Sequence, residues 1–199
     1  MNNAEVRTVH LVLHANSIWN EAGKTQGHRD TPLSKRGYAM AERLGLREDL
    51  QSIRTLVSSD LRRAIETVLP LSRRLGIPIQ KFANLREGRW AHSHEDPEFP
   101  LLAFPVASET PEDVKRRSWK TLQELVASDF EFPMLLVTHG GFLRSFLEQI
   151  VDDGTSLEKP VRTAINTLRY ESGKWQLVSL NDDRHLEGLD KASKVLDFG

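Results

Sequence analysis

The stretch "MLLVTHGGFLRSFLEQI", residues 134–150, constrains the fold more than any other part of the chain. It opens with a short apolar run of strand length, which leads into a histidine and two glycines. The apolar residues that follow share one face of a helix: Phe142, Leu143, Phe146, Leu147 and Ile150. A strand, a glycine turn and an amphipathic helix in direct succession are typical of layered α/β proteins.

The same alternation extends along the chain. Strands are expected at 6–13, 53–57, 77–79, 134–138, 163–170 and 174–180. Helices are expected at 34–46, at 60–75 with Asp60 as its N-cap, and from Thr110 to about residue 128. The pattern predicts an α/β fold, a three-layer α/β/α sandwich with a mostly parallel central sheet, in one domain over residues 1–199. Residues 88–110 contain prolines and no clear period, so we expect an irregular flap there.

The composition excludes several classes of function. The chain has 27 basic and 28 acidic side chains, so no overall field favours nucleic acid or a membrane as a partner. Because the chain has no cysteine, it has no disulfide, no thiolate nucleophile and no zinc site built on sulfur. No apolar run is long enough to span a bilayer and residues 1–8 lack a signal-peptide pattern, so we expect a cytoplasmic protein.

Two histidines follow predicted strands. His14 ends the strand in "LVLHANSIWN", residues 11–20, and His139 ends the strand of residues 134–138. The carboxyl ends of sheet strands are where ligands bind in α/β folds, and imidazole can act as a nucleophile, an acid, a base or a phosphate ligand. A loop histidine is also often merely solvated, so either histidine alone is weak evidence for a site.

Two further stretches carry charges at similar positions. "SSDLRRAIET", residues 58–67, places Arg62 and Arg63 in the first turn of a helix, where a cation is unfavourable unless it binds an anion. One of these arginines could instead pair with Asp60 or Glu66. In "LREGRW", residues 85–90, Glu87 could donate a proton to a leaving group or form a surface ion pair.

Together with "GHRDTPLSKRG" and "VTHGGFLR", these stretches resemble, in order, the motifs of the histidine phosphatase superfamily, also called the phosphoglycerate mutase-like family. The resemblance covers residues 9–144. It implies that His14 is the nucleophile that becomes phosphohistidine and that Glu87 protonates the leaving oxygen. It further implies a phosphate pocket with no metal and no cofactor, formed by these residues: Asn20, Arg63, His139 and Gly140. Arg62 is expected to face outward.

The first motif departs from the family pattern. The residue before the nucleophile is arginine in the family but Leu13 here, and the next two positions are Ala15 and Asn16. Removing one preorganised donor from a phosphoryl-transfer site typically costs about 10²–10³ in rate, so weakened activity is expected to survive. The methyl group of Ala15 could also obstruct a backbone conformation that glycine adopts freely. The candidates to replace the missing guanidinium are Arg29, Arg86 and Arg89.

Three functions follow from this reading. The first is a metal-independent phosphatase that hydrolyses small phosphomonoesters through phospho-His14. The second, supported by Leu13, is an inactive pseudo-phosphatase that binds or regulates. A mutase is the third, and the short flap argues against it because a mutase needs a closed pocket. The ligand in each case is a small phosphomonoester or inorganic phosphate; Trp90, His92, His94 and Phe99 are candidates to contact the leaving group or to pack the flap.

Overall fold

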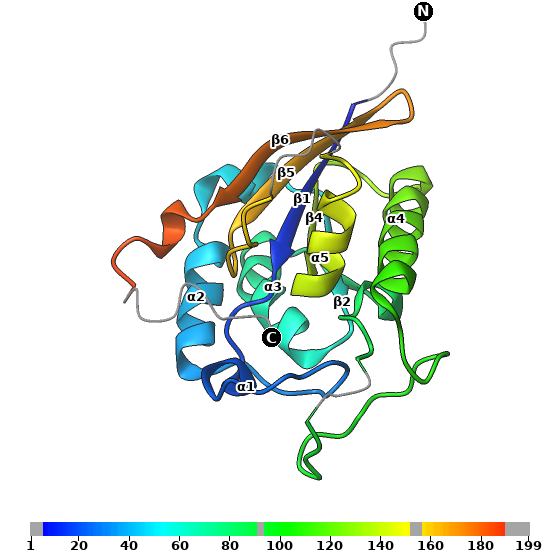
Figure 1. The fold of residues 1–199 in the computed structure, drawn as a ribbon. Coiled ribbons are helices and arrows are strands. Elements are labelled where there is room, and N and C mark those ends of the chain that lie inside the picture. The colour runs from blue at the N-terminus through cyan, green and yellow to red at the C-terminus, as the bar shows by residue number, and fades with distance from the viewer. Residues whose placement is uncertain (1–5, 91–93, 152–156, 190–199) are drawn as a thin grey trace, which may run out of the picture.

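A computed structural model describes residues 6–90, 94–151 and 157–189. Its centre is a six-stranded sheet with the order β3-β2-β4-β1-β5-β6 (Figure 1). The strands are β1 (Arg7–Leu13), β2 (Thr55–Ser59), β3 (Ile79–Phe82), β4 (Met134–Thr138), β5 (Ile165–Glu171) and β6 (Lys174–Asp182). The first four strands in the order are mutually parallel, whereas β5 runs antiparallel to both of its neighbours. The expected mostly parallel sheet is confirmed.

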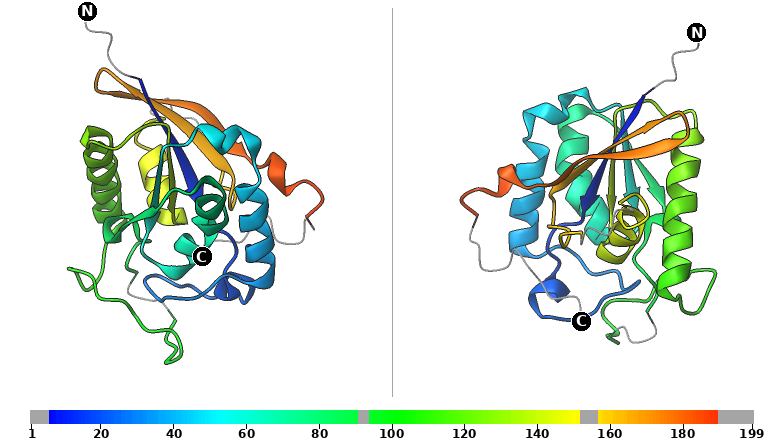
Figure 2. Two further views of the ribbon diagram at one scale, coloured as in Figure 1. Left: turned by 180° about the vertical axis from the view of Figure 1, so that it is seen from behind. Right: turned by 45° about the horizontal axis from the view of Figure 1, so that its top comes forward.

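Helices cover both faces of the sheet. They are α1 (Ile18–Glu21), α2 (Lys35–Gly45), α3 (Arg62–Leu75), α4 (Pro111–Ala127) and α5 (Gly140–Leu147), with short 3₁₀ turns η1 (Glu48–Ser52), η2 (Ala83–Leu85) and η3 (Arg184–Leu186). One apolar core joins α4 and α5 to one face of the sheet, and a second joins α2 and α3 to the other face. Figure 2 shows α2 and α4 on opposite sides of the sheet. The three-layer architecture is therefore confirmed. No helix within these described ranges is long and apolar enough to cross a membrane.

The start of α4 follows its sequence signals. The Thr110 hydroxyl accepts the backbone N–H of Asp113, and the Asp113 carboxylate accepts the backbone N–H of Thr110 in return. This reciprocal capping box satisfies two groups that a helix N-terminus otherwise leaves unpaired.

The predicted role of Asp60 as an N-cap is wrong. The N-cap of α3 is Leu61, which makes no side-chain capping bond. Both carboxylate oxygens of Asp60 instead accept hydrogen bonds from the guanidinium of Arg86 at 2.6 Å. A bidentate arginine pair is stronger than a single cap bond, so Asp60 fixes the loop that contains Glu87.

The flap has no helix and no strand within its described residues, 88–90 and 94–110. The Arg29 guanidinium anchors it by donating to the carbonyl oxygens of Asp96 and Phe99 at 3.3 and 3.0 Å. The Phe99 ring packs edge-on against Trp19 at 5.8 Å, as does His94 at 6.2 Å. These two side chains pack the flap onto the domain, and the prediction for His92 lies outside the described residues.

Candidate active site

The topology brings the predicted site residues to one edge of the sheet. Because β2, β4 and β1 are adjacent and parallel, their carboxyl ends meet. A pocket of about 470 Å³ lies at this edge. Five of the six predicted residues line it: His14, Asn20, Arg63, Glu87 and Gly140. The sixth, His139, has its ring 5.0 Å from the ring of His14.

His14 is buried and held in one orientation. Its Nδ1 lies 2.7 Å from the carbonyl oxygen of Ala15, and a carbonyl can only accept, so Nδ1 carries the proton. The lone pair is therefore on Nε2, which accepts from Nε of Arg63 at 3.3 Å. Burial, followed by the charges of Arg162 and Arg63, lowers the pKa of His14 well below its usual value. The ring is neutral at physiological pH, as a nucleophile requires.

Arg63 presents a buried guanidinium to this ring. Its Nη1 and Nη2 donate to the carbonyl oxygens of Arg29 and Gly27, each at 2.8 Å. Burial lowers the pKa of Arg63 to about 10, so the group stays charged at neutral pH. Arg62 is half exposed and pairs with Glu66 at 2.7 Å, so the expectation that it faces outward is confirmed.

His139 is the N-cap residue of α5. Both of its ring nitrogens are buried and have no hydrogen-bond partner among the residues that the structure describes. Burial, with the charge of Arg63 next, lowers the pKa of His139 well below its usual value. Buried polar atoms are rarely left unpaired, so this ring is available to a ligand.

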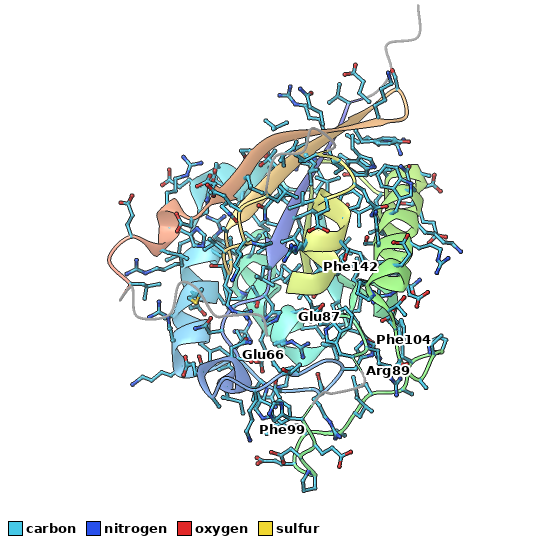
Figure 3. All side chains as sticks on the ribbon, viewed as in Figure 1. Glu66, Glu87, Arg89, Phe99, Phe104 and Phe142 are labelled. Carbon is cyan, nitrogen blue, oxygen red and sulfur yellow. The ribbon has the colours of Figure 1, made fainter. Side chains whose placement is uncertain are left out.

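Glu87 faces the N-terminal end of α5 (Figure 3). Its Oε2 accepts the backbone N–H of Gly141 at 3.1 Å, and its Oε1 accepts that of Gly88 at 2.8 Å. A Cβ atom on Gly141 would overlap Oε1 of Glu87. Glycine at position 141 therefore permits the close approach that fixes the Glu87 carboxyl in the pocket.

The arginines named as possible replacements for a guanidinium at position 13 do not line the pocket. Arg29 anchors the flap, Arg86 pairs with Asp60, and Arg89 donates to the carbonyl of Phe104 at 3.4 Å. Leu13 itself is buried in the apolar core that α4 and α5 share with the sheet. These three candidate replacements are therefore wrong.

Ala15 is not strained. Among the described residues, the non-glycine positions with positive φ are Thr163, Ser172 and Asn181. The backbone N–H of Ala15 donates to the Thr67 hydroxyl at 2.9 Å. The methyl group thus does not prevent the loop after His14 from adopting its conformation.

Arg162 contacts the ring of His14 and is a pocket residue that sequence reasoning missed. Its Nη1 lies 3.4 Å from both ring nitrogens of His14. It comes just before β5, which is antiparallel to β1, so the start of β5 meets the carboxyl end of β1. A prediction of this antiparallel pairing would have placed Arg162 beside His14. Trp90 also lines the pocket, as do three cations nearer its rim: Lys24, Arg144 and Lys159.

The buried histidines predict a loss of stability in mild acid. Burial lowers the pKa of His28 and of His185 to about 4, and His14 and His139 are lowered too. Below about pH 6.5 the unfolded chain binds protons that the folded protein does not, so each such histidine lowers the free energy of unfolding by up to about 1.4 kcal/mol per pH unit. We expect urea denaturation in phosphate-free buffer to show this loss between pH 6.5 and about 4. An unchanged free energy from pH 7 to pH 5 would contradict it.

Comparisons with known proteins identify the family of this chain. The model of the histidine phosphatase superfamily (branch 1) matches residues 9–183. The metal-independent phosphoserine phosphatase of Arabidopsis thaliana is 27% identical over 94% of this chain and 86% of its own. The glucosyl-3-phosphoglycerate phosphatase of Mycobacterium tuberculosis is 35% identical over 69% of this chain and 72% of its own. The structure of Bacillus stearothermophilus YhfR has a TM-score of 0.78 at 24% identity, covers 91% of this chain and 100% of its own, and supports the fold. The chain belongs to the histidine phosphatase superfamily.

Proposed function

We propose that the protein is a phosphatase that hydrolyses small phosphomonoesters through a phosphohistidine at His14. The observation that carries the proposal is a neutral imidazole whose Nε2 lone pair lies beside a buried, charged guanidinium. Such a pair provides a nucleophile and a charge that attracts the phosphoryl group to it. Relatives named as phosphoserine and glucosyl-3-phosphoglycerate phosphatases support the proposal.

The reaction has two steps. In the first, Nε2 of His14 attacks phosphorus, the bond from phosphorus to the ester oxygen breaks, and Glu87 gives a proton to the departing alcohol. In the second, a water molecule attacks phospho-His14, Glu87 takes a proton from that water, and the bond from Nε2 to phosphorus breaks. Inorganic phosphate and neutral His14 result. Asn20, Arg63, His139 and the backbone N–H of Gly140 at the start of α5 would hold the phosphoryl oxygens.

Leu13 supports a second candidate, a binding module without turnover. The resemblance places arginine at this position in the family, and Leu13 is 1% exposed in an apolar core, where it offers no charge to a ligand. A module of this kind would bind inorganic phosphate and release none from esters. Phosphate release from a panel of alkyl and aryl phosphates, with phosphate binding measured in parallel, separates the two functions.

We expect EDTA to leave phosphate release unchanged. The side chains and N–H groups around His14 meet the charge of the phosphate, and the described ranges contain no group of three or more His, Asp or Glu side chains that could hold a metal ion. Initial rates with and without the chelator test this. Loss of activity that magnesium restores would contradict the mechanism.

A further inference from the structure

Arg162 places a second guanidinium at the candidate nucleophile. The residue is buried and lines the same pocket as Arg63 and Glu87. Besides its contacts with the ring nitrogens, its Nη1 donates to the carbonyl oxygen of His14 at 3.3 Å. Arg63 approaches the same ring from the start of α3, so two cations from distant parts of the chain share one imidazole.

This guanidinium has no carboxylate at ion-pair distance within the described part of the chain. The buried arginines away from the pocket are paired: Arg47 with Asp49 and Asp182, and Arg86 with Asp60. A buried charge without an ion-pair partner is costly, and the nearby charge of Arg63 adds repulsion that the charge of Glu87 offsets only in part. An anion between the two arginines would remove both costs.

The backbone beside Arg162 is held in a strained conformation. Thr163 has a φ of 59°, which is a true outlier for a β-branched residue. Its N–H donates to the carbonyl of Leu13 at 2.8 Å, and its hydroxyl donates to the carbonyl of Arg162 at 2.7 Å. The same hydroxyl lies 3.0 Å from Nε2 of His185, which can donate to it. Strain of this kind persists where surrounding bonds fix it, and it is concentrated at functional sites.

We propose that Arg162 binds the phosphoryl oxygens together with Arg63, so that the two guanidiniums clamp the phosphate at His14. The planar fork of each arginine matches two oxygens of a phosphate, and the charge on the transferring group is spread over three. The clamp rests on the proposed phosphate pocket, but its binding role does not require turnover. Arg162 would thus provide, from the segment before β5, a charge that Leu13 lacks.

The test uses Arg162→Met, Arg162→Lys and a matched control, Arg62→Met. The control removes one positive charge from an exposed side chain next to Arg63. For each protein we would measure the dissociation constant of inorganic phosphate by calorimetry, the melting temperature in phosphate-free buffer, and kcat/KM with p-nitrophenyl phosphate.

Arg162→Met should raise the dissociation constant of phosphate by about tenfold or more, which is the usual effect of losing a hydrogen bond to a charged group. Its kcat/KM should fall by about 10²-fold or more, as when one preorganised donor is removed. Its melting temperature without phosphate should equal or exceed that of the parent, because an unpaired buried charge is gone. Arg162→Lys should bind phosphate with intermediate affinity, and Arg62→Met should match the parent.

Parent-like phosphate binding in Arg162→Met would overturn the clamp. Parent-like phosphate binding combined with a markedly lower melting temperature of Arg162→Met would instead give Arg162 a structural role through the His14 carbonyl. Should the methionine variant fail to fold, parent-like phosphate affinity in Arg162→Lys would overturn the clamp, because lysine lacks the fork. A parent protein that binds phosphate through Arg162 but releases none from esters would refute the phosphatase proposal alone.

Discussion

Replacement of His14 by alanine should lower the rate of phosphate release by about 10⁴-fold or more. Removing only the nucleophile of an enzyme lowers the rate nearly as much as removing all of its catalytic residues together. The chain has no cysteine, and among the described residues that line the pocket His14 is the side chain whose neutral ring nitrogen lies beside two guanidiniums. Steady-state release of phosphate from alkyl and aryl esters measures the effect.

The control for this variant is His10→Asn, four residues earlier and within β1, where the side chain contacts Thr167 rather than the pocket. We expect it to retain parent activity. His14→Ala should still bind inorganic phosphate, since Arg63, Arg162 and His139 remain. Parent-like turnover by a folded His14→Ala protein would remove His14 from the mechanism.

Replacement of Glu87 by glutamine should have an effect that depends on the leaving group. For alkyl phosphates, whose leaving oxygen needs a proton in the transition state, the first step should slow by about 10²–10⁴-fold, the usual contribution of a general acid. An activated aryl phosphate leaves as a stable phenolate, so its first step should change little. Because Glu87 also serves the second step, the comparison uses the first turnover, measured by rapid mixing as release of the alcohol.

Glu98→Gln is the matched control, since Glu98 is an exposed glutamate of the flap. It should leave both substrates unaffected. The amide of Glu87→Gln can still accept one of the two N–H groups that hold the carboxylate, so the loop should keep its position. Equal slowing of the first turnover for alkyl and aryl esters would make Glu87 a positioning residue.

The elements of the fold were predictable because their signals are local. The apolar runs predicted a segment that overlaps each described strand, and the Thr110 cap located the start of α4. The ends of elements were less accurate: β3 begins at Ile79 rather than at 77, because Gly76 ends α3 in a left-handed conformation and the chain needs further residues to enter the sheet.

Long-range pairing explains what the sequence did not reveal about the site. The motifs led to His14 and His139, which directly follow parallel strands, to Arg63 in the first turn of α3, and to Glu87 in the loop after η2. Arg162 comes before an antiparallel strand and belongs to no motif, so nothing local distinguishes it from a surface arginine. The same holds for Asp60, whose partner Arg86 is 26 residues away.

The role of His14 is tested most directly by trapping its phosphorylated form. The protein would be mixed rapidly with p-nitrophenyl phosphate and quenched in alkali, which preserves phosphohistidine, and its peptides would be examined by mass spectrometry. The account predicts a phosphoryl group on the nitrogen of His14 that forms and decays fast enough to account for turnover and is absent from His14→Ala. Phosphate release with no phosphoryl group on the protein, or with one on a different residue, would contradict it.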